Sequence, residues 1–367
     1  MWRFSKSMEK LLFVFGRDKA LSYLELISYF KRKAISFKVI KKDEEYLIAE
    51  TELDAIKAVN ELGGTVKIGQ FVAEDVTRLI GNMPNKVYYA LQDFDSADAI
   101  NTLKREFKTQ KIKAQDITHK ISPTEIINKK MIETGSDFVY ANEMFFHTIA
   151  VSDVREIERR DTKRPVQDVT GAISIRLAKI LINLSQVKDN GELLDPFCGI
   201  GTILQEALLM NINVTGVDVS SEKVDSARKN LEWLKSQYRI NNKYRLSIGD
   251  ARFLSRILRY KVDAIATEPY LGPLVKEKLS IKEAEKRIDE LTQLYKIFFE
   301  EAYKILNSNG FLAIILPYFF VKNQKINIDI NKVKGKFKIY NIDNLIPIEY
   351  TTGKSKIGRE IYICQKS

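Results

Sequence analysis

Three aspartates and two glycines have the types and the spacing that suggest ligand chemistry. Asp195 ends the run ELLD and is followed by Gly199 and Gly201. Asp218 ends VTGVD, and Asp250 ends YRLSIGD. Glycines at such a strand-to-helix turn let a ligand approach the backbone at a helix N-terminus. Carboxylates at the ends of successive parallel strands would line one crevice, which suits a nucleoside carrying a cationic arm.

The turn differs from a dinucleotide fingerprint. The third glycine of G-x-G-x-x-G is replaced by Leu204, which argues against NAD. Asp195 would repel a pyrophosphate and attract an ammonium group, while Asp218 could accept hydrogen bonds from both ribose hydroxyls. S-adenosylmethionine fits this description. A single Asp in such a place often only caps the following helix, but three of them around a G-x-G turn favour the ligand.

A second polar segment follows the apolar run VDAIAT and reads Glu268-Pro269-Tyr270. The Glu268 carboxylate and a backbone carbonyl fixed by Pro269 could accept the two protons of an exocyclic amine, while Tyr270 stacks on the attached ring. Catalysis would then consist of positioning and electrostatics without a covalent intermediate. The alternative is a proline-containing loop with a surface tyrosine.

The elements that must position these residues follow from hydrophobic periodicity. From residue 191 strands and helices alternate regularly, which predicts an α/β fold with a doubly wound, mostly parallel sheet. Residues 11–72 alternate in a β-α-β-β-α-β order that is ferredoxin-like, with a hairpin near Asp43. Strand-like runs at 86–94, 137–141 and 145–151 indicate a second small α/β unit. The charged stretch 152–168 is interpreted as a connecting segment.

Composition narrows the partners. The chain has 367 residues with 59 Lys and Arg against 48 Asp and Glu, and this positive balance predicts attraction to a polyanion. Two cysteines and two histidines cannot build a four-ligand zinc site by themselves, so no metal is expected. Cys198 is interpreted as a small apolar filler. No run approaches the ~20 apolar residues of a membrane span, so we expect a soluble cytoplasmic protein without a membrane partner.

These residues resemble the class I S-adenosylmethionine-dependent amino-methyltransferases. More narrowly, the chain is similar to the tRNA guanine-N2-methyltransferases with a THUMP domain, the group that acts on guanine 10. The narrower resemblance depends on four segments: RDTKRP at 160–165, LAKILINLSQ, DPFCGIGTILQEAL, and GREIYI at 358–363. It implies a Rossmann-like, doubly wound, seven-stranded methyltransferase sheet preceded by an α+β ferredoxin-like and THUMP module.

The resemblance also implies residue roles and domain boundaries. Asp195, Gly199 and Gly201 would bind the methionine end of the cofactor, Asp218 the ribose and Asp250 the adenine amine. The remaining cofactor-binding candidates are Pro196, Phe197, Thr202, Val219 and Ala251. Glu268, Pro269 and Tyr270 would form the catalytic set around the target base. The expected domains are a ferredoxin-like domain (1–74), a THUMP RNA-binding domain (75–152), a linker (153–183) and the methyltransferase domain (184–367).

The N-terminal half resembles the module that grips the acceptor end of tRNA. Basic side chains are therefore candidates for phosphate contacts: Lys104, Arg105, Lys108, Lys111, Lys113, Arg155, Arg159, Arg160, Lys163 and Arg164. Any one of them could instead be a solvated surface charge. A small activating protein is considered as a further partner, with a monomer as the alternative.

One departure from the family pattern bears on function. The family's D-P-P-Y is E-P-Y-L here, and Glu is one methylene longer than Asp. The leading hypothesis is a tRNA methyltransferase acting on an exocyclic amine, with N2 of guanine 10 as the first candidate. An RNA-binding relative with weak or lost catalysis is the alternative from another class. Other acceptors, namely adenine N6, a DNA base or a glutamine amide, also stay open.

Overall fold

The computed structural model describes residues 8–72, 76–95, 98–168, 173–273, 275, 279–351 and 357–367. The chain divides into two compact units, one of residues 1–26 and 34–160 and one of residues 27–33 and 161–367. The predicted boundary between residues 74 and 75 lies outside the described residues. We describe each unit by itself, and the helices at 19–33 and 154–163, which cross the division, are given with the first unit.

The first unit begins with the predicted β-α-β-β-α-β order. Its elements are β1 (Glu9–Phe15), α1 (Lys19–Lys33), β2 (Phe37–Lys42), β3 (Tyr46–Thr51), α2 (Ala55–Glu61) and β4 (Thr65–Phe71). The hairpin of β2 and β3 is antiparallel, as expected. The second part contains α3 (Thr77–Ile80), β5 (Lys86–Asp93), α4 (Ala99–Thr109), β6 (Lys113–Asp116), α5 (Pro123–Asn128), β7 (Asp137–Ala141), β8 (Met144–Val151) and α6 (Val154–Lys163).

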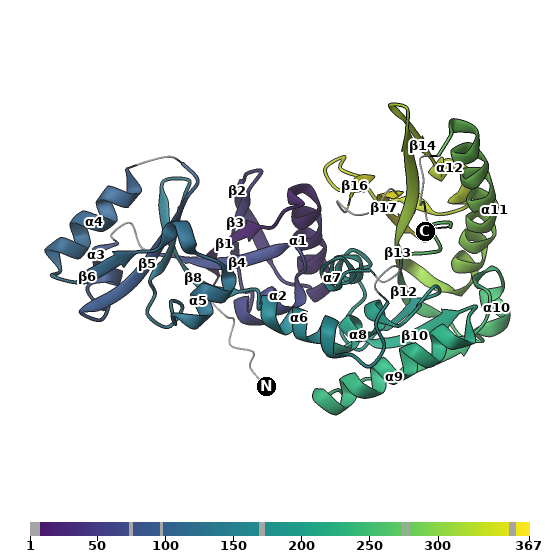
Figure 1. The fold of residues 1–367 in the computed structure, drawn as a ribbon, viewed down its shortest axis with the longest axis horizontal. Helices are drawn as coiled ribbons and strands as arrows, with labels where there is room; N and C mark the ends of the chain where they lie inside the picture. The colour runs from purple at the N-terminus through teal and green to yellow at the C-terminus, as the bar shows by residue number, and fades with distance from the viewer. Residues whose placement is uncertain are drawn as a thin grey trace. The chain divides into compact units, whose positions relative to one another are not determined.

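Both parts of this unit share one sheet. Within the described residues its strand order is β2-β3-β1-β4-β8-β7-β5-β6, so β8 joins the two parts by antiparallel pairing with β4 (Figure 1). A hydrophobic cluster between β5 and α4 includes Tyr89, Leu103 and Phe107, which are all buried. The separation into a ferredoxin-like and a THUMP domain stays a prediction.

Part of the charged stretch after β8 is a helix, while its role as a connecting segment stays a prediction. Helix α6 runs from Val154 to Lys163. Its charges pair along one helix face, since Glu156 contacts Arg159 and Arg160 one turn later. Pairs at these spacings add modest stability to a helix in which only Val154 and Ile157 are apolar.

The second unit contains the predicted α/β alternation. Its elements are α7 (Ile175–Leu184), β9 (Glu192–Asp195), α8 (Thr202–Leu209), β10 (Asn213–Asp218), α9 (Ser221–Gln237), β11 (Tyr244–Ile248), α10 (Leu254–Ile257), β12 (Val262–Thr267), α11 (Ile281–Ile305), β13 (Leu306–Val321), β14 (Gln324–Asn327), α12 (Ile330–Val333), β15 (Lys338–Ile339), β16 (Ile348–Tyr350) and β17 (Ile357–Gln365).

The sheet of this unit is mostly parallel, as predicted. In the described part of the chain its strands follow the order β11-β10-β9-β12-β13-β17-β15, with β14 on β13 and β16 on β17. The strands from β11 to β13 are parallel to one another, and β17 is antiparallel to β13. Helix α11 packs along β13 and β14 (Figure 1). The carboxyl ends of β9, β10, β11 and β12 therefore meet at one edge.

No helix in the described ranges is long and apolar enough to cross a membrane.

Candidate active site

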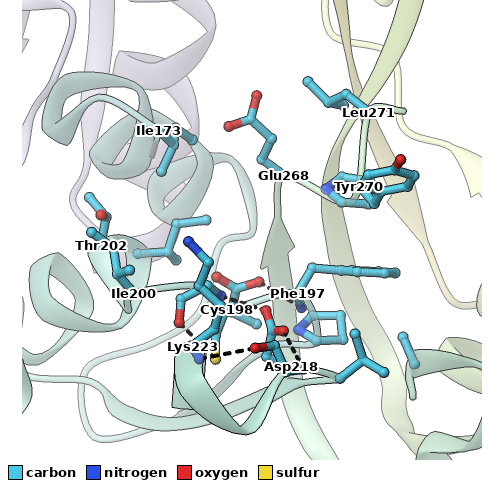
Figure 2. Close-up of a pocket in the computed structure, with 18 of the residues that line it drawn as sticks. Ile173, Phe197, Cys198, Ile200, Thr202, Asp218, Lys223, Glu268, Tyr270 and Leu271 are labelled. Atoms are coloured by element: carbon cyan, nitrogen blue, oxygen red, sulfur yellow. Dashed lines mark hydrogen bonds between the residues drawn. The ribbon is translucent and has the colours of Figure 1, made fainter. Parts of the chain in front are cut away.

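A cavity of about 690 Å³ lies at the carboxyl edge of the second unit's sheet. Asp195, Asp218, Asp250 and Glu268 all line it, together with the Gly199 turn. They lie together because their four strands are parallel and adjacent, so their ends converge. Figure 2 shows Asp218, Glu268 and Tyr270 around the same pocket. The volume is in the range of pockets for small ligands and cofactors.

The glycine turn is built from left-handed backbone. Gly199 has a φ of +51° and Gly201 a φ of +86°, a backbone conformation in which residues other than glycine are strained. Gly201 also starts α8, and a Cβ there would lie 3.2 Å from the Cβ of Ala227 on α9. A Cβ on Gly199 would meet no atom within 4 Å. The turn therefore presents bare backbone to the cavity.

The Asp218 carboxylate is held by backbone donors on both oxygens. The amide of Gly199 donates to Oδ2 at 2.9 Å, and the amide of Ser220 donates to Oδ1 at 3.0 Å. Each oxygen can accept a further hydrogen bond. A rigid carboxylate with remaining acceptor capacity can bind a diol. Val219, beside it, is 72% exposed.

Asp195 is buried at the end of β9. Its Oδ1 accepts a hydrogen bond from the Thr267 hydroxyl on β12 at 2.7 Å and one from the Phe197 amide at 3.3 Å. Burial raises the pKa of Asp195 to about 7, because the bond from Thr267 offsets only part of the desolvation. Because burial disfavours the charged form of this carboxyl group, a cation bound beside it would stabilise the carboxylate.

Asp250 interacts with a residue that sequence reasoning missed. The Arg252 side chain donates to both of its oxygens, with the Nη2 to Oδ2 distance at 2.5 Å. These hydrogen bonds lower the pKa of Asp250 below its ordinary value, so the carboxylate is ionised at neutral pH. An adenine amine would share this carboxylate with Arg252. Ala251 begins the short 3-10 turn that follows.

The remaining cofactor candidates also line the cavity. The Phe197 ring contacts Phe298 edge-on at 5.3 Å between centroids. Thr202 Oγ1 accepts a hydrogen bond from Arg164 Nη1 at 2.9 Å. Burial raises the pKa of the Cys198 thiol, which agrees with a packed and unreactive cysteine. Pro196 lies directly after Asp195 in the cavity wall.

The segment after β12 combines a buried acid with an exposed ring. The Glu268 side chain is 9% exposed and its Oε1 lies 2.6 Å from Arg359 Nε, on β17. Tyr270 is 55% exposed, and its backbone carbonyl accepts a hydrogen bond from the Tyr295 hydroxyl at 2.6 Å. Pro269 is buried between them. The segment is thus anchored at its backbone while the Tyr270 ring stays accessible.

Arg359 is the second residue that sequence reasoning missed. It lies in the GREIYI segment, which was noted only as part of the family resemblance. Its place in the pocket depends on the antiparallel pairing of β17 with β13, a contact between distant parts of the chain. The sequence contains no local signal for it.

Eight of the ten basic candidates for phosphate contacts are exposed. They are Lys104, Arg105 and Lys108 on α4, Lys111 and Lys113 after it, and Arg155, Arg159 and Lys163 on α6. The other two expectations are corrected by the structure. Arg160 is buried and paired with Glu156, and Arg164 is buried against Thr202 and Asp161. A guanidinium enclosed in this way cannot reach an RNA phosphate.

Comparison with known proteins agrees with this geometry. The family described as UPF0020, RMKL-like methyltransferase domain, matches residues 162–319. The crystal structure of TrmN from Thermus thermophilus aligns with a TM-score of 0.50 at 16% identity, covering 98% of this chain and 100% of that one. At this identity the likeness concerns the fold alone.

Curated relatives extend the comparison to the family. The chain is 35% identical over 162 residues to the tRNA (guanine(10)-N2)-dimethyltransferase of Methanothermobacter thermautotrophicus, a match that covers 44% of this chain and 43% of that protein. The match therefore spans less than half the length of that relative. This chain is also 30% identical over 156 residues to a probable tRNA (guanine(10)-N2)-dimethyltransferase of Methanothermococcus thermolithotrophicus. That match covers 42% of this chain and 84% of that protein. On this evidence of sequence and fold, the chain belongs to the tRNA (guanine(10)-N2)-dimethyltransferase family.

Proposed function

We propose that this protein is an S-adenosylmethionine-dependent tRNA methyltransferase that modifies an exocyclic amine, namely N2 of guanine 10. The observation that carries the proposal is that one cavity contains both the three strand-end aspartates and the Glu268-Pro269-Tyr270 segment. A cofactor crevice and an acceptor loop that share a cavity allow direct transfer between two bound reactants. The names of the relatives support the choice of tRNA and of guanine.

The residues present fit this cofactor. Asp195 offers a buried carboxylate to an ammonium group, and the bare backbone of Gly199 leaves room for the amino-acid arm. Asp218 is oriented by two amides to accept hydrogen bonds from the ribose hydroxyls. Asp250 would accept a hydrogen bond from the adenine amine. When bound, S-adenosylmethionine supplies an electrophilic methyl group on a sulfonium.

The acceptor side would position the amine. Glu268 and the backbone carbonyl of Pro269 would accept its two N–H groups and orient the nitrogen lone pair toward the crevice. The exposed ring of Tyr270 would stack on the base. These groups work by orientation and fixed charge, so no covalent intermediate with the protein is required.

Cofactor binding is expected to release protons near pH 6. The pKa of Asp195 is about 7 in the free protein, so at about pH 6 the carboxyl is mostly protonated. A bound ammonium group favours the carboxylate, so binding displaces up to about one proton and affinity rises as pH increases through the pKa. Titration calorimetry with S-adenosylhomocysteine in two buffers of different ionisation enthalpy measures this release. Equal heats in both buffers would contradict the role of Asp195.

RNA affinity is expected to depend steeply on salt. Each neutralised phosphate contributes roughly −0.7 to −0.9 to the slope of log K against log salt. Replacing Lys104, Lys108 and Lys111 with alanine should lower tRNA affinity and reduce this slope by about two to three. Arg228 and Lys229, exposed on α9, supply a control double-alanine variant. If the control lowers the slope as much as the triple variant, the phosphate contacts are not confined to the first unit.

The proposed activity is tested by transfer of labelled methyl from S-adenosylmethionine to unmodified tRNA, followed by nucleoside analysis. Labelled N2-methylguanosine or N2,N2-dimethylguanosine is the expected product, and mapping should locate it at position 10. Label on adenine would mean that adenine, and not guanine, is the acceptor base. Binding of cofactor and tRNA without any transfer would favour the RNA-binding relative.

A further inference from the structure

The acceptor carboxylate of this chain is held in an ion pair within the cavity wall. Arg359 Nε lies 2.6 Å from Glu268 Oε1, and both residues line the cavity. The second oxygen of Glu268, Oε2, has no hydrogen-bond partner within the part of the chain that the structure describes. Figure 2 shows the Glu268 side chain directed away from Asp218. One oxygen is therefore anchored and the other can accept.

Sheet register explains how a residue near the C-terminus reaches this carboxylate. Thr267, at the end of β12, is paired with Ile314 on β13. Farther along β13, Pro317 is opposite Arg359 on the antiparallel strand β17. Arg359 therefore lies beyond the end of β12, at the edge where Glu268 follows the strand.

We propose that Arg359 is a positioning residue that keeps the Glu268 carboxylate ionised and orients its free oxygen toward the N–H groups of the target amine. This inference rests on the proposed function of the cavity. The Glu268 side chain, which follows β12, reaches Arg359 on β17 although β13 lies between these two strands. The free oxygen of a carboxylate accepts hydrogen bonds only, so it favours a base edge that presents a donor, such as N2–H of guanine.

The charges around Glu268 show why it needs a cation. Burial raises its pKa, and Arg359 opposes that rise both as a charge and as a hydrogen-bond donor. The carboxylates of Asp195 on β9 and Glu268 repel each other. The Tyr295 phenol on α11 also interacts electrostatically with the Glu268 carboxylate. Without Arg359 the carboxyl would take up a proton nearer neutral pH. The protonated oxygen would then donate where an acceptor is required.

Packing alone does not account for the arginine. Its Nη1 is buried and has no hydrogen-bond partner among the described residues. Burying an incompletely bonded guanidinium is unfavourable, so a residue selected only for stability would satisfy its donors better. The contact that Arg359 does make, with the Glu268 carboxylate, is therefore the feature that explains its place in the cavity wall.

The first test needs no catalysis. Carbon NMR of protein labelled at the glutamate carboxyl, with Glu268→Gln to assign the signal, follows the titration of Glu268. In Arg359→Gln its pKa should rise by about one unit or more, while Arg359→Lys should restore most of the wild-type value. Arg245→Gln is the matched control, because Arg245 pairs with Glu192 at 3.1 Å on the same sheet but outside the cavity lining. An unchanged titration in Arg359→Gln, with the fold intact by thermal unfolding, overturns the proposal.

The second test is a double-mutant cycle on single-turnover methyl transfer to tRNA. Arg359→Gln should lower the rate about 10- to 100-fold at pH 7 and move the rise of rate with pH to higher pH, with cofactor affinity preserved. In the Glu268→Gln background, whose amide does not titrate, the same change should cost less than about 3-fold. Equal losses in both backgrounds would mean that Arg359 acts on its own or through structure, and would overturn the inference.

The two proposals fail differently. If the wild-type protein transfers methyl to no base, the proposed function fails, whereas the NMR titration still decides whether Arg359 governs Glu268. If transfer occurs and neither the titration nor the cycle couples the two residues, the proposed function stands and this inference fails.

Discussion

Replacing Glu268 with alanine is expected to lower the rate of methyl transfer by about 100- to 1,000-fold while leaving cofactor affinity unchanged. The side chain lies on the acceptor side of the cavity, and the cofactor carboxylates are on other strands. Removing it takes away the acceptor for the amine and leaves the Arg359 cation without its 2.6 Å partner. Single-turnover transfer to tRNA and calorimetric binding of S-adenosylhomocysteine measure the two effects separately.

Glu268→Gln is the matched control for this prediction. Its amide oxygen can still accept one hydrogen bond, so we expect it to retain more activity than the alanine variant. An undiminished rate in Glu268→Ala would remove this residue from the catalytic set. A parallel loss of cofactor affinity would mean that the cavity is not divided into a cofactor side and an acceptor side.

Replacing Asp218 with alanine is expected to weaken cofactor binding by about 100-fold or more while tRNA affinity stays within about 2-fold. Two hydrogen bonds to a charged carboxylate contribute roughly 3 kcal/mol or more, and 1.4 kcal/mol corresponds to a factor of ten. The substitution also removes the acceptor for the amides of Gly199 and Ser220, so the glycine turn loses its anchor. Calorimetry with S-adenosylhomocysteine and filter binding of labelled tRNA provide the two affinities.

Asp218→Asn separates the two roles of this side chain. The amide keeps one oxygen for a backbone donor but lacks the charge, so an intermediate loss is expected. A loss of tRNA affinity equal to the loss of cofactor affinity would contradict separate binding regions. Unchanged cofactor affinity in Asp218→Ala would exclude Asp218 from the ribose contact.

Local sequence patterns were sufficient for most of the helices and strands and for the edge of the sheet that contains the cavity. The β-α-β-β-α-β order of residues 11–72 was expected and is present, and the alternation after residue 191 predicted the parallel strands β9 to β13. Periodicity works here because burial of an apolar face dictates where each residue type recurs. Helix α6 was missed because only Val154 and Ile157 among its ten residues are apolar, which is too few to give a recognisable apolar stripe.

The sequence by itself determined the carboxylates of the cavity. Asp195, Asp218 and Glu268 each follow an apolar strand-forming run, and parallel strands bring such ends together whatever the rest of the chain does. Only the tertiary structure decided how these carboxylates are charged and held. Arg359 reaches Glu268 through pairing of β17 with β13, Arg164 is enclosed against Thr202, and burial sets the pKa of Asp195. Desolvation and long-range strand pairing depend on which residues, distant in the sequence, surround a given residue in the fold. The local spacing of residue types does not predict those neighbours.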